Sequence, residues 1–208
     1  MRLTSVLATA TAVAMAIGGG AAAAPLAFGG ATIGMSLSAW RALAPPDGVD
    51  PTARPACSSD TRVVAAGSSA LSPALLPGGE VACAYASVYG RTVLISAAPL
   101  AGRYVADDLR FVFAEGRLDE IDFRTSVDAY NVVEAQLSAR YGPPTATTRV
   151  WAQTAIGRLA RVQQTWSASG GTVTLTDPAK PLSDLQVRLI GTRGGARHAT
   201  TGRPAAVG

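Results

Sequence analysis

Hydrophobic and polar positions alternate most regularly between Leu109 and Phe123. Leu109, Phe111 and Phe113 fall on one side of an extended segment, because successive side chains of a strand point to opposite faces. Glu115-Gly116 follows as a turn, and Ile121 and Phe123 then alternate with charged residues. This pattern predicts an antiparallel hairpin with one buried face.

A helix is predicted directly after this hairpin, from Ser126 to Tyr141. Thr125 and Asp128 have the spacing of a capping box, and Gly142 with the prolines after it marks the end of the helix. A hydrophobic stripe recurs at steps of three and four residues, formed by Val127, Tyr130, Val133, Leu137 and Tyr141. We expect this stripe to cover the apolar face of the hairpin, formed by Phe111, Phe113, Ile121 and Phe123.

The rest of the chain shows short strand patterns and one more helix. The helix is predicted from Ser36 or Ser38 to about Ala44, and residues 45–56 and 68–79 are expected to be loops. Strands are predicted at Thr61–Ala65, Val81–Tyr85, Thr92–Ser96, Thr147–Ala152, Leu159–Ser167, Thr172–Thr176 and Leu185–Ile190. The fold class is therefore α+β: an antiparallel sheet of about six to eight short strands, in hairpins and a meander, covered on one face by one or two helices.

Both ends of the chain differ from this central pattern. Residues 1–24 have the features of a signal peptide: Arg2, an apolar run to Ile17, three glycines, and an Ala-rich cleavage site at Ala23 or Ala24. The alternative is a membrane anchor, which needs an unbroken apolar run of roughly twenty residues. Residues 192–208 lack apolar periodicity and are predicted to be a disordered basic tail. We thus expect one domain over residues 25–191, periplasmic or secreted, with no membrane span after signal cleavage.

The basic character of the chain comes from these ends. The sequence has 18 Lys+Arg and 14 Asp+Glu. Four of the arginines lie in the leader or the tail, namely Arg2, Arg193, Arg197 and Arg203. The domain itself is therefore formally neutral, and no basic field indicates a nucleic-acid partner.

Two cysteines, Cys57 and Cys83, follow the predicted export signal. An even pair in an oxidising compartment is typical of a disulfide, and a loop of this length contributes about 3 kcal/mol in the chain-entropy model. The alternative is two buried free thiols that behave as small hydrophobic residues.

The sequence offers little for catalysis. His198 is the sole histidine and lies in the predicted tail, and no nucleotide-binding or metal-binding motif is present, so we expect no cofactor, no metal and no catalytic residue. Glu120 and Asp122 would share the polar face of a strand, where they can act as acid and base or bind a cation. The alternative is a solvated sheet face that Arg110, Arg117 and Arg124 neutralise.

A binding surface is the better-supported candidate. Five polar or aromatic positions on the C-terminal strands are predicted to share the outward face of the sheet: Arg149, Trp151, Arg161, Gln163 and Arg188. Trp151 is expected beside Arg161 across a hairpin, and an exposed Trp next to Arg is typical of an interface anchor. The alternative is that a twist or bulge places Trp151 in the core and Val150 outside.

Two short motifs resemble known exported proteins. Gly34-Met35-Ser36 with Trp40, Leu43 and Pro45 is similar to a helix start in the outer-membrane assembly lipoprotein BamE. Leu137, Arg140-Tyr141-Gly142 and Pro144 resemble a helix end seen in related envelope proteins, and the secreted β-lactamase-inhibitor proteins share the helix-on-sheet architecture. The resemblance implies an α+β exported domain that binds other proteins. This chain lacks the lipidated cysteine of the assembly lipoprotein.

From these observations we predict an exported, non-enzymatic domain that binds another envelope or secreted protein. Two rival functions stay open: a small hydrolase that uses Glu120, Asp122 and an arginine, and a periplasmic carrier with a small ligand between helix and sheet.

Overall fold

The computed structural model describes residues 24–67, 71, 72, 76, 79–101, 103–154, 157–180 and 184–195. The predicted signal peptide, apart from residue 24, and the predicted tail beyond residue 195 lie outside the described residues. Residues 192–195 continue the ordered chain, and the Thr192 N–H donates to the Gly170 carbonyl at 3.0 Å. None of the helices formed by the described residues is long and apolar enough to cross a membrane.

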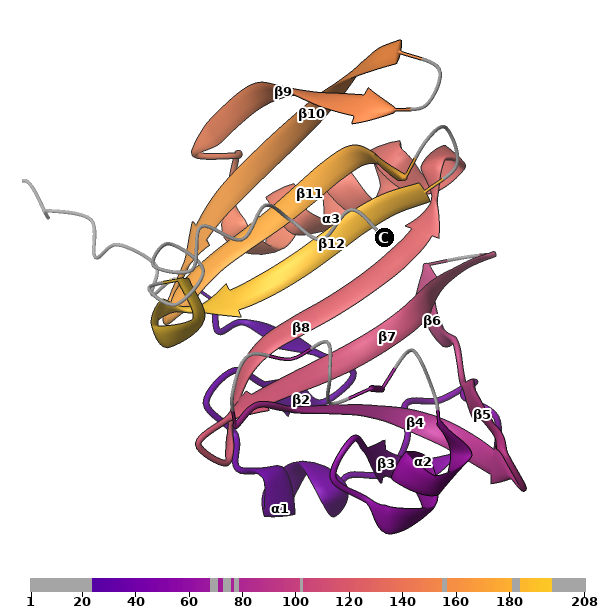
Figure 1. The fold of residues 1–208 in the computed structure, drawn as a ribbon. Helices are drawn as coiled ribbons and strands as arrows, with labels where there is room; N and C mark the ends of the chain where they lie inside the picture. The colour runs from indigo at the N-terminus through magenta and orange to yellow at the C-terminus, as the bar shows by residue number, and fades with distance from the viewer. Residues whose placement is uncertain are drawn as a thin grey trace, which may run out of the picture.

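A ten-stranded antiparallel sheet forms the body of the molecule (Figure 1). Along its main path the strands are β3 (Arg54–Cys57), β4 (Val81–Tyr89), β7 (Tyr104–Ala114), β8 (Arg117–Ser126), β12 (Asp184–Gly191), β11 (Gly171–Lys180), β10 (Gly157–Ala168) and β9 (Ala146–Thr154). Off this path, β5 (Thr92–Ile95) pairs with β4 and β6 (Ala98–Ala101) pairs with β7. The predicted antiparallel sheet is confirmed, and it has more strands than expected.

The order of the strands decides which one lies at the free edge. The C-terminal strands β9 to β12 form a meander in which each strand pairs with the next. The last of them, β12, returns to the middle of the sheet and pairs with β8. The first, β9, is therefore left at the margin farthest from β8, as Figure 1 shows at the top of the molecule.

One face of the sheet carries most of the hydrophobic core, and we call it the helix face. Its buried side chains include Tyr85, Phe111, Ile121, Val187 and Trp166. We call the opposite side the polar face, because β8, β11 and β12 present charged residues and threonines there. Strand register assigns each residue to a face, since directly paired residues point the same way.

Helix α1 (Leu37–Arg41) covers the N-terminal half of the helix face. Ser36 begins it by accepting a hydrogen bond from the Ala39 N–H at 3.1 Å. Trp40 is fully buried, and its ring lies 5.1 Å from Phe111 and 5.7 Å from Phe113, centre to centre. An aromatic ring of this size buried against two others contributes through both apolar area and ring geometry.

Helix α3 (Tyr130–Tyr141) covers the C-terminal half and lies behind β11 and β12 in Figure 1. It packs against β10, where the Tyr130 hydroxyl donates to the side-chain oxygen of Gln164 at 3.0 Å. Its predicted stripe does face the core, with Val133 buried and Leu137 half-buried. The expectation that this stripe is the cover of Phe111 and Phe113 needs correction, because Trp40 of α1 contacts those rings.

The start of α3 also differs from the prediction. Thr125 is the penultimate residue of β8 and is buried, so it does not cap the helix. Ser126 instead accepts from the Asp128 N–H at 3.3 Å and begins a short 3₁₀ turn, Val127–Ala129, that leads into α3. The predicted end is confirmed, since Gly142 has a positive φ of 84°.

A third helix, α2 (Thr61–Ala66), stands where a strand was predicted. Val63 and Val64 favoured a strand by propensity, yet Gly67 ends a helical turn in the left-handed conformation. Val63 is buried in a cluster with Ala82 and Ala84 on the far side of β4. Helices therefore lie on both faces of the sheet, and not on one as expected.

Four shorter strands lie outside the predicted ones, and the first of those named here, β3, falls largely in the segment 45–56 that was predicted as a loop. They are β3 and β6 of the main sheet and a separate two-stranded hairpin of β1 (Ala27–Phe28) and β2 (Ala31–Thr32). Phe28 of this hairpin contacts the ring of Phe123 at 4.7 Å between centres. The N-terminal segment thereby contributes Phe28 to the core that packs on β8.

Candidate functional site

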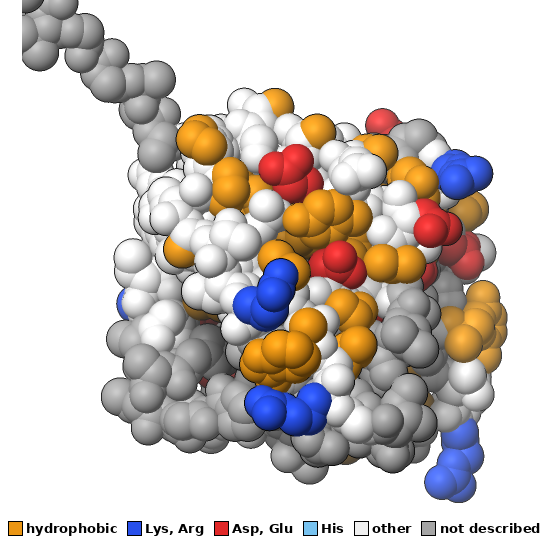
Figure 2. All heavy atoms as spheres, turned by 90° about the horizontal axis from the view of Figure 1, so that it is seen from above, with side chains coloured by type: hydrophobic (Ala, Val, Ile, Leu, Met, Phe, Trp, Pro, Cys, Tyr) orange, Lys and Arg blue, Asp and Glu red, His pale blue; other side chains and the backbone are white. Residues whose placement is uncertain are grey.

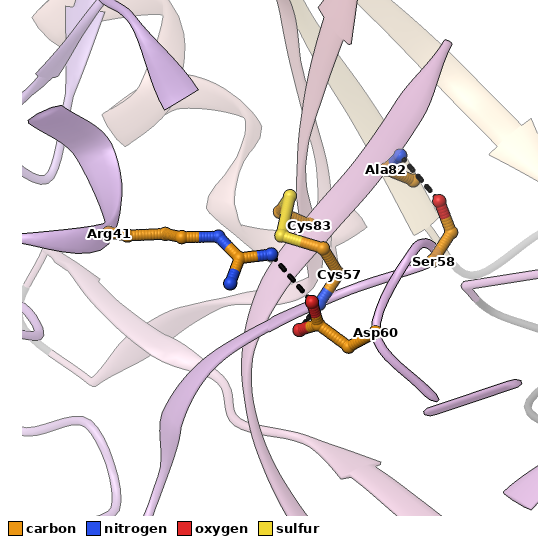
Figure 3. Close-up of a disulfide and its surroundings, with 6 residues drawn as sticks. All are labelled: Arg41, Cys57, Ser58, Asp60, Ala82 and Cys83. Atoms are coloured by element: carbon orange, nitrogen blue, oxygen red, sulfur yellow. Dashed lines mark hydrogen bonds and ion pairs between the residues drawn. A yellow bond between two sulfur atoms is a disulfide. The ribbon is translucent and has the colours of Figure 1, made fainter. Parts of the chain in front are cut away.

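The disulfide is the first candidate that the structure confirms. Cys57 and Cys83 are bonded, with 4.0 Å between their Cα atoms, and they are directly paired residues of β3 and β4 (Figure 3). Both are fully buried in the main core. The bond therefore joins a short edge strand to the sheet and has a structural role.

An ion pair lies beside this disulfide and ties α1 to the segment before α2 (Figure 3). Asp60 accepts from the Arg41 guanidinium at 2.6 Å and, through its other oxygen, from the Cys57 N–H at 2.8 Å. The Ser58 hydroxyl accepts from the Ala82 N–H at 3.1 Å. These contacts anchor α1 and the segment before α2 to the sheet beside the disulfide.

The polar face holds the carboxylates that sequence analysis named as candidate acids and bases. Asp122 is paired with Arg110 on the neighbouring strand and also accepts from the Gln186 amide at 2.8 Å. Glu120 is paired with Arg188 at 2.8 Å. Asp122 and Glu120 are both largely buried, so each depends on its cationic partner for stability.

Asp107 and Asp108 form another carboxylate group, near the start of β7. Burial, and then the charges of Asp108 and Asp184, raise the pKa of Asp107 above its ordinary value. Asp108 itself lies 3.4 Å from the Arg124 guanidinium. Within the described ranges, no three His, Cys, Asp or Glu side chains gather in an arrangement that would hold a metal ion.

The five residues of the predicted binding face are divided between the two faces of the sheet. Arg161 pairs with Val150, Gln163 with Thr176, and Arg188 with Thr174, which places all three on the polar face. Arg149 pairs with Val162 and Trp151 with Ala160, which places these two on the helix face with Trp166. The predicted contact between Trp151 and Arg161 is therefore not formed.

A one-residue difference in register is the reason. The prediction began the second strand of this hairpin at Leu159, whereas β10 begins at Gly157 and pairs there with Thr154. Because side chains alternate along a strand, a shift by one residue moves every side chain to the opposite face. The sequence did not show where β9 ends, so it could not determine which residues of β9 and β10 share a face.

Trp151 is nevertheless exposed, at 56 % of its full accessible area. Ala160, the residue of β10 paired with Trp151, lies four residues before Gln164, which is roughly 13 Å along the strand. Gln164 is the residue that the Tyr130 hydroxyl of α3 is bonded to. The alternative prediction placed Trp151 in the core. Trp151 does lie on the helix face, as that alternative required, but its side chain is not buried there. Helix α3 therefore leaves more than half of this side chain uncovered.

Arg158 is the residue that sequence reasoning missed. Its guanidinium carbon lies 5.4 Å from the centre of the Trp151 ring, within cation–π range. With the register known, Arg158 falls on the same face as Ala160 and therefore next to Trp151. Arg149, Trp151 and Arg158 together form what we call the hairpin surface.

The charged residues of the hairpin itself are basic, and the nearest acidic residue on this face is Asp177 of β11, which pairs with Val162 as Arg149 does from the other side. Strands β9 and β10 carry Arg149, Arg158 and Arg161 and contain no acidic residue. Figure 2 views the molecule from the side of β9 and β10 and shows exposed hydrophobic side chains among separate acidic and basic ones. An exposed indole flanked by two arginines has the composition that binding hot spots favour.

Comparison with known proteins gives no further lead, since no family model, curated protein sequence or solved structure matches this chain. The resemblance to exported envelope proteins therefore stays a prediction that rests on its short motifs.

Proposed function

We propose that this protein is an exported, non-enzymatic domain that binds another envelope or secreted protein through the hairpin surface. The observation that carries the proposal is the exposed Trp151 with Arg158 stacked on it, at a part of the helix face that α3 leaves uncovered. Leaving a large apolar ring in water is unfavourable by about 2 kcal/mol relative to burial, and a partner that covers the ring recovers that free energy.

The rigid scaffold supports this role. Trp151 is held on a strand paired residue by residue with β10, and the Arg158 guanidinium lies 5.4 Å from the centre of its ring. A preorganised anchor loses little conformational entropy when a partner binds. The disulfide between Cys57 and Cys83 is compatible with an oxidising compartment outside the cytoplasm.

The polar face supports a non-enzymatic role over the rival hydrolase. Glu120 and Asp122, the carboxylates that the hydrolase would use, are each bonded to an arginine of a neighbouring strand. Such cross-strand pairs stabilise the sheet. Both carboxylates are also largely buried, which limits their access to a substrate.

The test compares the protein with two variants that each shorten one exposed side chain. Trp151→Ala removes the proposed anchor, and Val132→Ala shortens a side chain on α3 that is 37 % exposed and lies outside the hairpin surface. A protein captured from an envelope or secreted extract is purified and its affinity for each form is measured. We expect Trp151→Ala to weaken binding by about 30-fold or more, the loss typical of a hot spot, and Val132→Ala to leave it unchanged.

The proposal is wrong if no purified partner distinguishes Trp151→Ala from the unaltered protein. Hydrolysis of a model ester or peptide that is lost on Glu120→Gln would instead support the rival enzyme.

A further inference from the structure

The outer edge of β9 is an open template for another strand. β9 is nine residues long and ends the sheet, and among the described residues no strand pairs with its outer side. Of the residue types that commonly protect an edge from pairing, it contains neither proline nor lysine, and Arg149 is its one charged residue. Its outward backbone N–H and C=O groups are thus available to an added strand.

The opposite margin of the sheet is protected by comparison. It is formed by β3 and β5, which are four residues long each, and β3 contains Pro55. A short edge with a proline offers few backbone donors. β5 also lacks proline and lysine but is only four residues long, so β9 offers by far the longer free edge of the two margins.

Charge indicates what kind of strand fits there. Arg149, Arg158 and Arg161 give β9 and β10 a positive charge at the free margin, while the nearest acidic residue in the row of Arg149, Asp177, lies on β11, two strands in from the edge. A second copy of the chain, paired through its own β9, would bring two such basic hairpins together. Every Asp and Glu of this sequence lies between Asp47 and Asp184, on residues that the structure describes, so the segments outside the described residues have no acidic side chain to offer.

The spacing of the hairpin surface specifies the sequence of the added strand. Arg149 and Trp151 are two residues apart on one face of β9. On a strand laid beside β9, the residues opposite them are also two apart and point to the same face. An acidic side chain opposite Arg149 and an apolar one opposite Trp151 would complement both.

We propose that β9 binds an extended acidic segment of another protein by strand addition, with an acidic and an apolar residue at alternate positions of that segment. This inference rests on the proposed function and names the class of partner. Backbone hydrogen bonds to the open edge supply affinity, and Arg149 with Trp151 supplies specificity. Nucleic acids and lipid headgroups share the negative charge but cannot complete the hydrogen bonds of a strand edge.

The test uses two labelled peptides, each as long as β9. One alternates valine with threonine and carries an aspartate at two alternate positions; the other has lysine in place of each aspartate. Fluorescence anisotropy measures their affinity for the purified protein, and amide hydrogen exchange reports whether β9 becomes protected. We expect the acidic peptide to bind about tenfold more tightly than the lysine peptide, and to protect amides of β9.

Two variants that each replace one arginine by glutamate distinguish binding at the edge of β9 from attraction by the net charge of the protein. Arg149→Glu should reverse the preference between the peptides, whereas Arg62→Glu, on the exposed side of α2 far from β9, should leave it unchanged (Figure 1). Trp151→Ala should weaken binding of both peptides.

Several results would overturn strand addition. The first two are that the acidic peptide does not bind at about 1 mM, the weak end of measurable affinity, and that Arg149→Glu and Arg62→Glu have equal effects. The next two are that the peptide binds without protecting β9, and that a single-stranded oligonucleotide or an anionic vesicle binds more tightly in an Arg149-dependent way. The last is that the protein associates with itself through β9. If a purified partner still binds in a Trp151-dependent way while either peptide test fails, strand addition is wrong and the proposed function stands. If Trp151→Ala also leaves partner binding unchanged, both are wrong.

Discussion

Two adjacent glycines in the turn between β10 and β11 have different reasons to be glycine. Gly170 has a φ of +89° with open space around it, whereas a Cβ on Gly171 would lie 2.0 Å from the backbone oxygen of Ile190. Gly171 pairs with Gly191 at the end of β12, so two strand backbones approach closely there.

Gly171→Ala should therefore destabilise the protein far more than Gly170→Ala. We expect a loss of at least about 2 kcal/mol in the free energy of unfolding for Gly171→Ala, because the backbone must move. Gly170→Ala should cost about 1 kcal/mol, the usual penalty for alanine at positive φ. Urea denaturation of the two variants provides the measurement, and equal midpoints would show that the strand ends are less closely packed.

Asp107 leads to a prediction about pH. Burial, Asp108 and Asp184 raise its pKa, so between the ordinary pKa of about 4 and the raised value the folded state holds more protons than the unfolded state. Stability contributed by this group is thus greatest below pH 4 and falls as the pH rises through that window.

Asp107→Asn should therefore stabilise the protein at neutral pH, and the difference from the unaltered protein should vanish below about pH 4. A carbon-detected NMR titration should show the raised pKa of Asp107, and Asp108→Asn should lower it toward the ordinary value. An Asp107 pKa unaffected by Asp108→Asn would contradict the assigned cause.

At the level of elements, α3 offers two neighbouring valines in different environments. Val133 is 2 % exposed against the core, and Val132 is 37 % exposed. Val133→Ala should cost about 2 kcal/mol through lost burial and the cavity it leaves. Val132→Ala should change stability by less than about 0.5 kcal/mol, as surface substitutions usually do.

Thermal or urea unfolding of this pair tests how α3 is rotated about its axis. Similar losses in both variants would mean that the helix does not pack through Val133.

The elements also show what sequence patterns can and cannot predict. The alternation around Phe111 and Phe123, the glycine at 142 and the cysteine pair were sufficient to predict the central hairpin, the end of α3 and the disulfide. The helix at Thr61–Ala66 was missed because packing of Val63 against β4 outweighs the strand propensity of its valines. The candidate surface was assigned to the wrong face because hairpin register depends on where each strand ends, and no local pattern showed that β10 starts at Gly157.

At the scale of the whole molecule, topology creates the candidate site. Because β12 closes the meander against β8, β9 is left at the margin, while α3 packs on β10 near Gln164 and Trp151 stays 56 % exposed. Trp151 and the open edge are two consequences of this one arrangement. The binding surface is thus a property of the sheet order and not of any local motif.

Amide hydrogen exchange along β9 in the free protein tests this arrangement most directly. A strand paired on one side alternates between amides bonded to its neighbour and amides that face outward. We predict alternating slow and fast exchange from Ala146 to Thr154, with uniformly slow exchange in the middle of β10. Slow exchange at every position of β9 would show that its edge is already covered, and fast exchange at every position would show that β9 is not part of the sheet; either result would contradict the open edge.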